Sequence, residues 1–204
     1  MKFILSILAL LAIAFLVGCS AKDTSSNNKL SNSEIAKLGK KYGGVYVFNK
    51  KFEKEIDDRE RERKEAIKEL KGRDLGGGLY AVDTKPVDQK FPQTLSNGKK
   101  YYTTTRAYGE DYNKQAKLPK IYKEKIINFI GQEDYNKFKP SMLLSYFYVD
   151  DNKNIIPIVV SVYYTIGYTK YGLFGDEGRG FSLSRRDIKD VGGDSVFYME
   201  DLEK

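Results

Sequence analysis

The side chains that could do chemistry in this 204-residue chain are its carboxylates, amines and phenols, because it contains no His, no Trp and a single Cys. Without His, a Ser-His-Asp triad, a Cys-His pair and a His-ligated zinc site are excluded. With one Cys, an internal disulfide and a Cys-ligated iron–sulfur cluster are excluded. We therefore expect no resident metal and no cofactor, and either acid–base catalysis by carboxylates or binding by charged and aromatic groups.

The acidic residues form no recognisable catalytic or metal-binding pattern. Asp150, Asn152 and Asn154 have the spacing that opens an EF-hand loop, but Ile155 and Ser161 stand where that loop needs Gly and Glu. This segment is therefore predicted to be a turn. Two acids from distant parts of the chain could still meet in the folded protein, as glycoside hydrolysis requires, so a hydrolase stays open as an alternative.

Positive charge is concentrated between Lys99 and Lys125, where eight basic residues stand against three acidic ones and five Tyr are interleaved. Amines can bind anions, and Tyr rings can pack on the apolar faces of sugars. The residues that we consider as possible contacts to an anionic partner are Lys99, Lys100, Arg106, Lys114, Lys117 and Lys120. Residues 50–74, by contrast, carry 10 basic and 9 acidic residues, which predicts a solvated helix surface and no nucleic-acid site.

The first residues have the composition of an export signal. Residues 1–2 are Met-Lys, and residues 3–15 are apolar apart from one Ser, a stretch too short to span a bilayer of roughly 30 Å. Residues 16–19 are Leu-Val-Gly-Cys. This motif resembles the lipobox that ends the signal peptide of bacterial lipoproteins. The resemblance implies cleavage between Gly18 and Cys19, and lipidation of Cys19 followed by acylation of its amino group.

A location follows from the same resemblance. Two or more acyl chains hold a protein stably on a membrane, so the resemblance implies a lipid-anchored protein of the cell envelope. Ser20 occupies the position where Asp usually retains Gram-negative lipoproteins in the inner membrane, which favours the outer membrane if the source is Gram-negative. The expected partners are the membrane, and an anionic envelope component or an envelope protein.

The chain divides into three parts on composition. Residues 1–18 are the signal peptide, residues 19–32 form a lipidated, polar and flexible tether, and residues 33–204 form one globular domain. We predict an α+β domain in which two or three helices pack on a mainly antiparallel sheet. Helices are expected after the capping-box pattern of Ser31 and Glu34, over residues 50–71 with ion pairs at the i,i+4 spacing, and from Pro119 at a first helical position.

The clearest strand signal is a hairpin of residues 142–149 and 155–166 around a five-residue loop. In its second strand the even-numbered residues from 156 to 166 are predicted to face the core, and Pro157, Ser161 and Thr165 to face a partly wet side. Further strands are expected at 45–48, 79–84, 99–108, 173–174, 180–183 and 195–199. Residues 76–78, three consecutive Gly, are predicted to link the helix to the strand that follows.

These patterns favour a lipid-anchored envelope binding or scaffold protein without catalytic activity. The alternative is an envelope hydrolase that uses paired carboxylates, for example on wall polysaccharide. A deep cleft with two facing carboxylates would favour the hydrolase, whereas an open sheet face or a charged patch would favour the binding protein.

Overall fold

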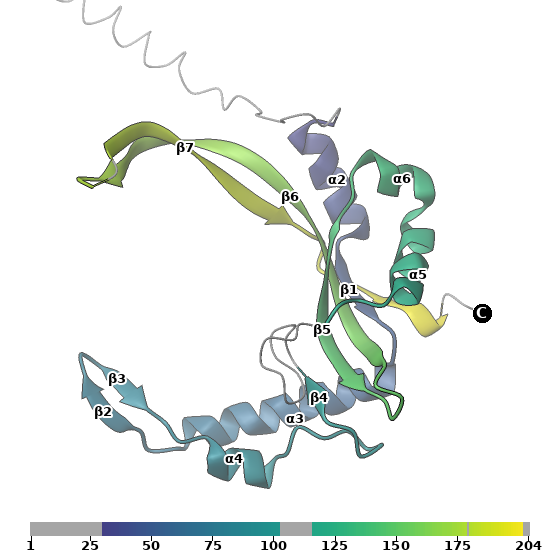
Figure 1. The fold of residues 1–204 in the computed structure, drawn as a ribbon, viewed down its shortest axis with the longest axis vertical. Coiled ribbons are helices and arrows are strands. Elements are labelled where there is room, and N and C mark those ends of the chain that lie inside the picture. The colour runs from purple at the N-terminus through teal and green to yellow at the C-terminus, as the bar shows by residue number, and fades with distance from the viewer. Residues whose placement is uncertain (1–29, 103–115, 179, 202–204) are drawn as a thin grey trace, which may run out of the picture.

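A six-stranded sheet lies at the centre of the molecule, which the computed structural model describes over residues 30–102, 116–178 and 180–201 (Figure 1). Five strands follow the order β4-β5-β6-β1-β8, and β7 pairs with β6. The pairings are antiparallel except that of β1 with β8. Helices pack on both faces, so the predicted α+β domain with a mainly antiparallel sheet is confirmed.

The elements follow the predicted order in most places. In chain order they are α2 (Asn32–Tyr42), β1 (Gly44–Val47), α3 (Lys50–Lys68), β2 (Arg73–Gly76), β3 (Leu79–Ala81), α4 (Lys85–Lys90), β4 (Tyr101–Tyr102), α5 (Lys120–Ile130), α6 (Gln132–Lys137), β5 (Ser141–Val149), β6 (Ile155–Asp176), β7 (Gly180–Val191), β8 (Ser195–Tyr198) and a 3₁₀ turn (Met199–Asp201). Pro119 is the N-cap of α5 and not its first helical residue. None of the described helices is long and apolar enough to cross a membrane.

The larger core lies between the sheet and helices α2, α5 and α6 (Figure 1). Tyr46, Val160 and Tyr164 of the sheet and Ile126 of α5 are fully buried in it. The predicted capping box begins α2, because the Ser31 hydroxyl accepts from the Glu34 amide while the Glu34 carboxylate accepts from the Ser31 amide. This core fixes the sheet and leaves the other face for α3 and for solvent.

A β-bulge changes which residues of β6 face each core. Tyr146 pairs with Val159 and Phe147 pairs with Pro157, so Ile158 has no partner residue of its own on β5. Ile158 and Val159 both pack in the smaller core under α3, while Val160 lies in the larger core. The prediction that the even-numbered residues share one face is therefore wrong before the bulge. Pro157, predicted on a partly wet face, is fully buried.

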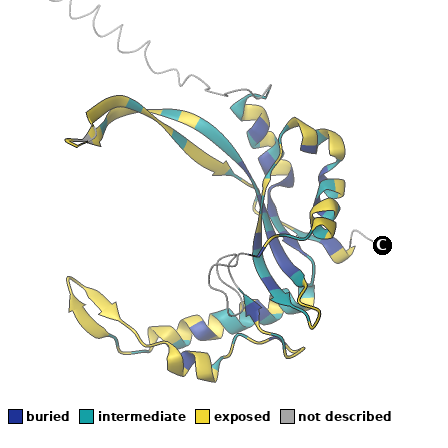
Figure 2. Cartoon of the chain, in the orientation of Figure 1, coloured by how far each residue is buried: buried dark blue, intermediate teal, exposed yellow. Residues whose placement is uncertain are grey.

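Two arms project from the sheet and give the molecule an open, curved outline (Figure 1). The first is the far part of the β6–β7 hairpin, and the second is made of the far half of α3, with α4 and the β2–β3 hairpin. Figure 2 shows both arms largely exposed. The prediction of separate short strands at 173–174 and 180–183 is wrong, because Gly172 and Gly175, at φ 158° and 125°, continue β6 through an irregularity instead of ending it.

The charged surface of α3 is solvated as predicted, but most of its ion pairs are not at the predicted spacing. Lys51 and Glu55, 3.9 Å apart, do lie at i,i+4. Arg61 contacts Asp58 at 2.5 Å, and Lys68 contacts Glu65 at 2.8 Å. Both pairs lie at i,i+3, where the sequence predicted i,i+4. Residues at i,i+3 and at i,i+4 both lie on one face of a helix. The paired residues therefore differ from the prediction, but the surface is charged as predicted.

Candidate binding surface

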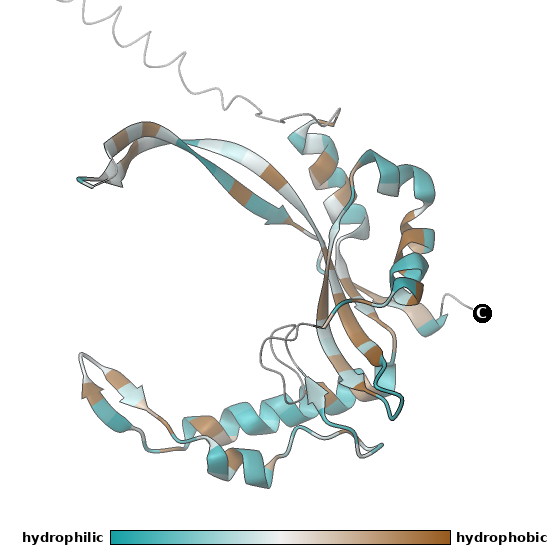
Figure 3. Ribbon diagram, in the orientation of Figure 1, coloured by the Kyte–Doolittle hydropathy of each residue, from teal (hydrophilic) through white to brown (hydrophobic). Residues whose placement is uncertain are grey.

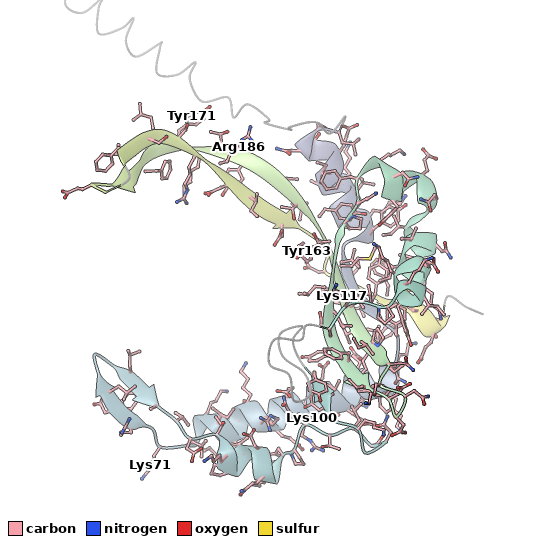
Figure 4. All side chains as sticks on the ribbon, viewed as in Figure 1. Lys71, Lys100, Lys117, Tyr163, Tyr171 and Arg186 are labelled. Carbon is pink, nitrogen blue, oxygen red and sulfur yellow. The ribbon has the colours of Figure 1, made fainter. Side chains whose placement is uncertain are left out.

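Among the described helices, only α3 packs on the sheet face away from α2, α5 and α6, and it covers part of that face (Figure 1). The register places Leu143, Ser161, Val45 and Val196 side by side across β5, β6, β1 and β8. We call these four residues the inner row. Leu143 and Val196 at its two ends are 44% and 48% exposed. Figure 4 shows Tyr163, next along β6 on the same side, pointing away from the helices.

The β2–β3 hairpin forms the end of the second arm and carries apolar side chains in solvent. The exposed residues are Leu75, Leu79, Tyr80 and Val82, and Leu79 and Tyr80 are 67% and 62% exposed. Figure 3 shows apolar segments on this hairpin and on the β6–β7 hairpin. Residues 76–78, predicted as a linker from helix to strand, instead make the tight turn of this hairpin, with positive φ at all three Gly.

A buried guanidinium attaches α4 and the following loop to α3. Arg63 donates through Nη1 to the Phe91 carbonyl oxygen at 2.6 Å and through Nη2 to Asp88 Oδ1 at 2.5 Å. One turn away, Glu60 Oε1 accepts from the Tyr101 hydroxyl at 2.6 Å and from Gln93 Nε2 at 2.9 Å. These contacts fix the segment that follows the β2–β3 hairpin, so the base of the hairpin has a defined position.

A groove of about 510 Å³ lies between α3 and the edge strand β8, beside Tyr198. Glu53 and Asp57, one turn apart on α3, line it. Partial burial raises the pKa of Glu53, with a further increase from Asp57. Burial also raises the pKa of Asp57, with Asp58 adding to the increase and Arg61 opposing it. Among the described residues that line the groove, the carboxylates of Glu53, Asp57 and Asp58 all come from α3, and none faces them from the other side.

The basic residues predicted between Lys99 and Lys125 do not form one contact surface in the described part of the chain. Lys99 is paired with Asp151, Lys120 lies 3.6 Å from Glu124, and the Lys100 amine lies 5.6 Å from the centre of the Tyr102 ring. Lys117 is exposed, and Figure 4 shows it well apart from Lys100. Arg106 and Lys114 lie outside the described residues. The four described amines therefore have different surroundings and do not gather into one contact surface.

The remaining predictions concern the lipidation site, metal binding and the segment of residues 150–154. Gly18 and Cys19 lie outside the described residues. Within residues 30–102, 116–178 and 180–201, no three His, Cys, Asp or Glu side chains gather closely enough to hold a metal ion. The 150–154 segment is a turn as predicted, in which Asp150 accepts from the Asn154 amide at 2.7 Å.

Sequence reasoning missed the exposed apolar residues of the two hairpins. Residues 79–82 were predicted as part of a strand, but a strand with this pattern normally turns one face to a core. The signal available was the neighbouring run of three Gly, which fits a hairpin turn better than a linker. No protein-family model matches the chain, and no curated protein or solved structure matches it, so the surface has to be interpreted from its own chemistry.

Proposed function

We propose that this chain is a lipid-anchored binding protein of the cell envelope, without catalytic activity, and that a partner protein binds the inner row and the β2–β3 hairpin. The observation that carries the proposal is the exposure of Leu79 and Tyr80 on a projecting two-stranded hairpin. Apolar patches bordered by polar residues are typical of interaction sites. A lone hairpin is marginally stable in water and gains stability when a partner covers it.

The contact is expected to be mainly apolar. Lys99 and Lys120 already have acidic partners within the chain, which reduces their attraction for an external anion. The inner row offers Leu143 and Val196, and the hydroxyls of Ser145 and Ser161 satisfy each other at 2.7 Å. An envelope protein therefore fits this surface better than a wall polymer or a lipid head group does.

The lipid anchor in this proposal is inferred from the lipobox-like motif at residues 16–19. Replacing Cys19 with Ala should abolish palmitate labelling and move the protein out of the firmly held membrane fraction. Labelling of the variant at the level of the unchanged protein would refute the anchor without affecting the binding surface.

Site-specific photo-crosslinking in cells tests the binding surface. A photoreactive amino acid at Tyr80 should give a discrete adduct, whereas the same group at Ile121, 60% exposed on α5, should not. Leu143→Lys on the inner row should then weaken the adduct formed at Tyr80. The absence of an adduct at Tyr80, or the same adducts at both positions, would contradict the proposal.

A second candidate function, hydrolysis by paired carboxylates, is favoured by the raised pKa values of Glu53 and Asp57 in the α3–β8 groove. It predicts that Glu53→Gln and Asp57→Asn each abolish release of sugar from wall polysaccharide. The binding proposal predicts no such release from the unchanged protein, and unaltered crosslinking at Tyr80 in both variants.

A further inference from the structure

The β6–β7 arm, residues 168–189, has apolar side chains in solvent that neither core accounts for. The exposed ones are Tyr168, Tyr171, Leu173, Phe181, Leu183 and Ile188. Leu183 and Ile188 are 77% and 75% exposed, more than any of the large apolar side chains of the β2–β3 hairpin. Of the described residues, β6 and β7 pair only with each other along this length, so the arm is a two-stranded ribbon without a covering layer.

The charges of the arm are divided between its strands and its turn. Residues 168–175 and 181–189 contain four basic residues and one acidic residue, namely Lys170, Arg185, Arg186, Lys189 and Asp187. Asp187 lies against Arg185 at 3.1 Å. Residues 176–180, between these two stretches, add Asp176, Glu177 and Arg179. The strands thus combine apolar and basic groups, as interfacial membrane-binding segments do. The charged residues of the turn disfavour insertion by the tip.

The chain enters the described structure beside this arm. Asn32, at the start of α2, donates from Nδ2 to the carbonyl oxygen of Gly167 at 2.8 Å, one residue before the arm begins. Cys19 precedes Leu30 by 11 residues, which reach at most about 37 Å when fully extended. A bilayer that holds the acyl chains of Cys19 therefore lies within that distance of Leu30. Figure 1 shows the β2–β3 hairpin at the other end of the molecule.

We propose that the β6–β7 arm lies along the surface of the anionic bilayer that carries the anchor, with its strands at the head-group level and its charged turn in water. This inference rests on the proposed lipid anchor, and it adds an orientation. Tyr side chains prefer the interface, and Lys and Arg are attracted to anionic lipid. The β2–β3 hairpin is then directed away from the membrane, where an envelope protein can reach it.

Fluorescence quenching on the full-length, lipidated protein tests the orientation. Ser182→Cys on the arm, or Ala81→Cys on β3 as the matched control, carries a polarity-sensitive dye, and the lipidated Cys19 cannot react with it. The protein is reconstituted into phosphatidylcholine vesicles with about one third phosphatidylglycerol and brominated acyl chains. Quenching at position 182 should exceed that at position 81 about threefold, because interfacial segments lie within reach of the acyl chains.

A charge reversal supplies the second measurement. Lys170→Glu with Arg186→Glu changes the net charge of the two arm strands from +3 to −1. The double variant should lose most of the quenching at position 182 while it still floats with the vesicles. Unchanged quenching would show that the contact does not depend on anionic lipid and would overturn the proposal.

Three other results would distinguish a wrong orientation of the arm from a wrong lipid anchor. Equal quenching at positions 182 and 81, in protein that floats with the vesicles, would overturn the orientation and leave the anchor standing. Dye incorporation at Cys19 together with loss of flotation would refute both. A dye shift at position 182 in detergent without vesicles, with a doubled mass in light scattering, would assign the arm to a second copy of the chain and overturn the lipid assignment.

Discussion

Replacing Arg63 should destabilise the protein more than replacing any neighbouring charged residue of α3. Its side chain is 10% exposed, and its two hydrogen bonds reach Asp88 and the Phe91 carbonyl. Arg63→Met keeps the apolar stem but removes both donors. The Phe91 carbonyl and the Asp88 carboxylate then lose a partner that water replaces only in part.

The magnitude follows from these two contacts. A hydrogen bond from a charged donor contributes about 1.5–3 kcal/mol, and we take about 2 kcal/mol for the contact to Phe91. The Asp88 side chain is 52% exposed, so screening by water lowers its pairing to about 1 kcal/mol. The expected loss is about 3 kcal/mol, which at an m-value of about 2 kcal/mol/M lowers the urea midpoint by about 1.5 M.

Urea unfolding followed by circular dichroism measures this change. Arg61→Met is the matched control, because Arg61 pairs with Asp58 but is 69% exposed, and it should cost less than about 1 kcal/mol. Arg63→Lys keeps the charge but cannot reach both acceptors with one amine, so it should recover less than half of the loss. Equal midpoints for Arg63→Met and Arg61→Met would refute the reasoning.

Three other changes have definite expected outcomes. Val160→Asp puts an unpaired charge in the larger core and should cost several kcal/mol of about 5–15; an unchanged urea midpoint would contradict this. The Tyr42 hydroxyl and Lys137 lower the pKa of Asp134 to about 2, so the stability they give is complete above about pH 4 and lost as pH falls towards 2. Tyr42→Phe should therefore lower the free energy of unfolding at pH 7, and should lower it by a smaller amount at pH 2. The same decrease at both pH values would contradict this. Gly175→Ala, with its Cβ 2.0 Å from a carbonyl oxygen across the hairpin, should reduce hydrogen-exchange protection in the β6–β7 arm alone, and loss of protection in α2 would contradict this.

The parts of the fold that were predicted correctly depend on local signals. The capping box of Ser31 and Glu34, the helix that became α3 and the hairpin around residues 150–154 each follow from residues close together in sequence. These signals also gave the class of the domain, because the alternation of helices and long strands limits the possible layers.

The errors arise where partners far apart in the chain decide the outcome. The bulge that buries Pro157 depends on the register between β5 and β6 and leaves no mark in the alternation of β6 itself. Gly172 and Gly175 looked like strand ends, yet β7 supplies the pairing that lets β6 pass through them. The short helix α4 was also not predicted, and its Asp88 contacts Arg63 of α3, 25 residues earlier in the chain.

Contacts between residues far apart in the chain also explain why the candidate surface was not predicted. A sequence shows that Lys99 is basic, but not that it pairs with Asp151, 52 residues later. Exposure of Leu79 and Leu183 is likewise a property of the whole fold, because a strand pattern alone predicts burial of one face. The charge pattern therefore indicates a region in which Lys99 and Lys120 pair with acidic residues, and it gives no sign of the exposed apolar hairpins.

The apolar side chains of the arms are best explained by what the arms contact outside the chain. Among the described residues, neither core cluster contains a residue from 73–82 or from 168–189, so these side chains contribute little to burial on folding. A polar residue at Leu79 or Leu183 would cost the isolated domain little, and would remove apolar surface that attracts other molecules. The two arms lie at opposite ends of the molecule, and the chain enters beside one of them. One exposed hairpin can therefore meet the membrane while the other meets a partner.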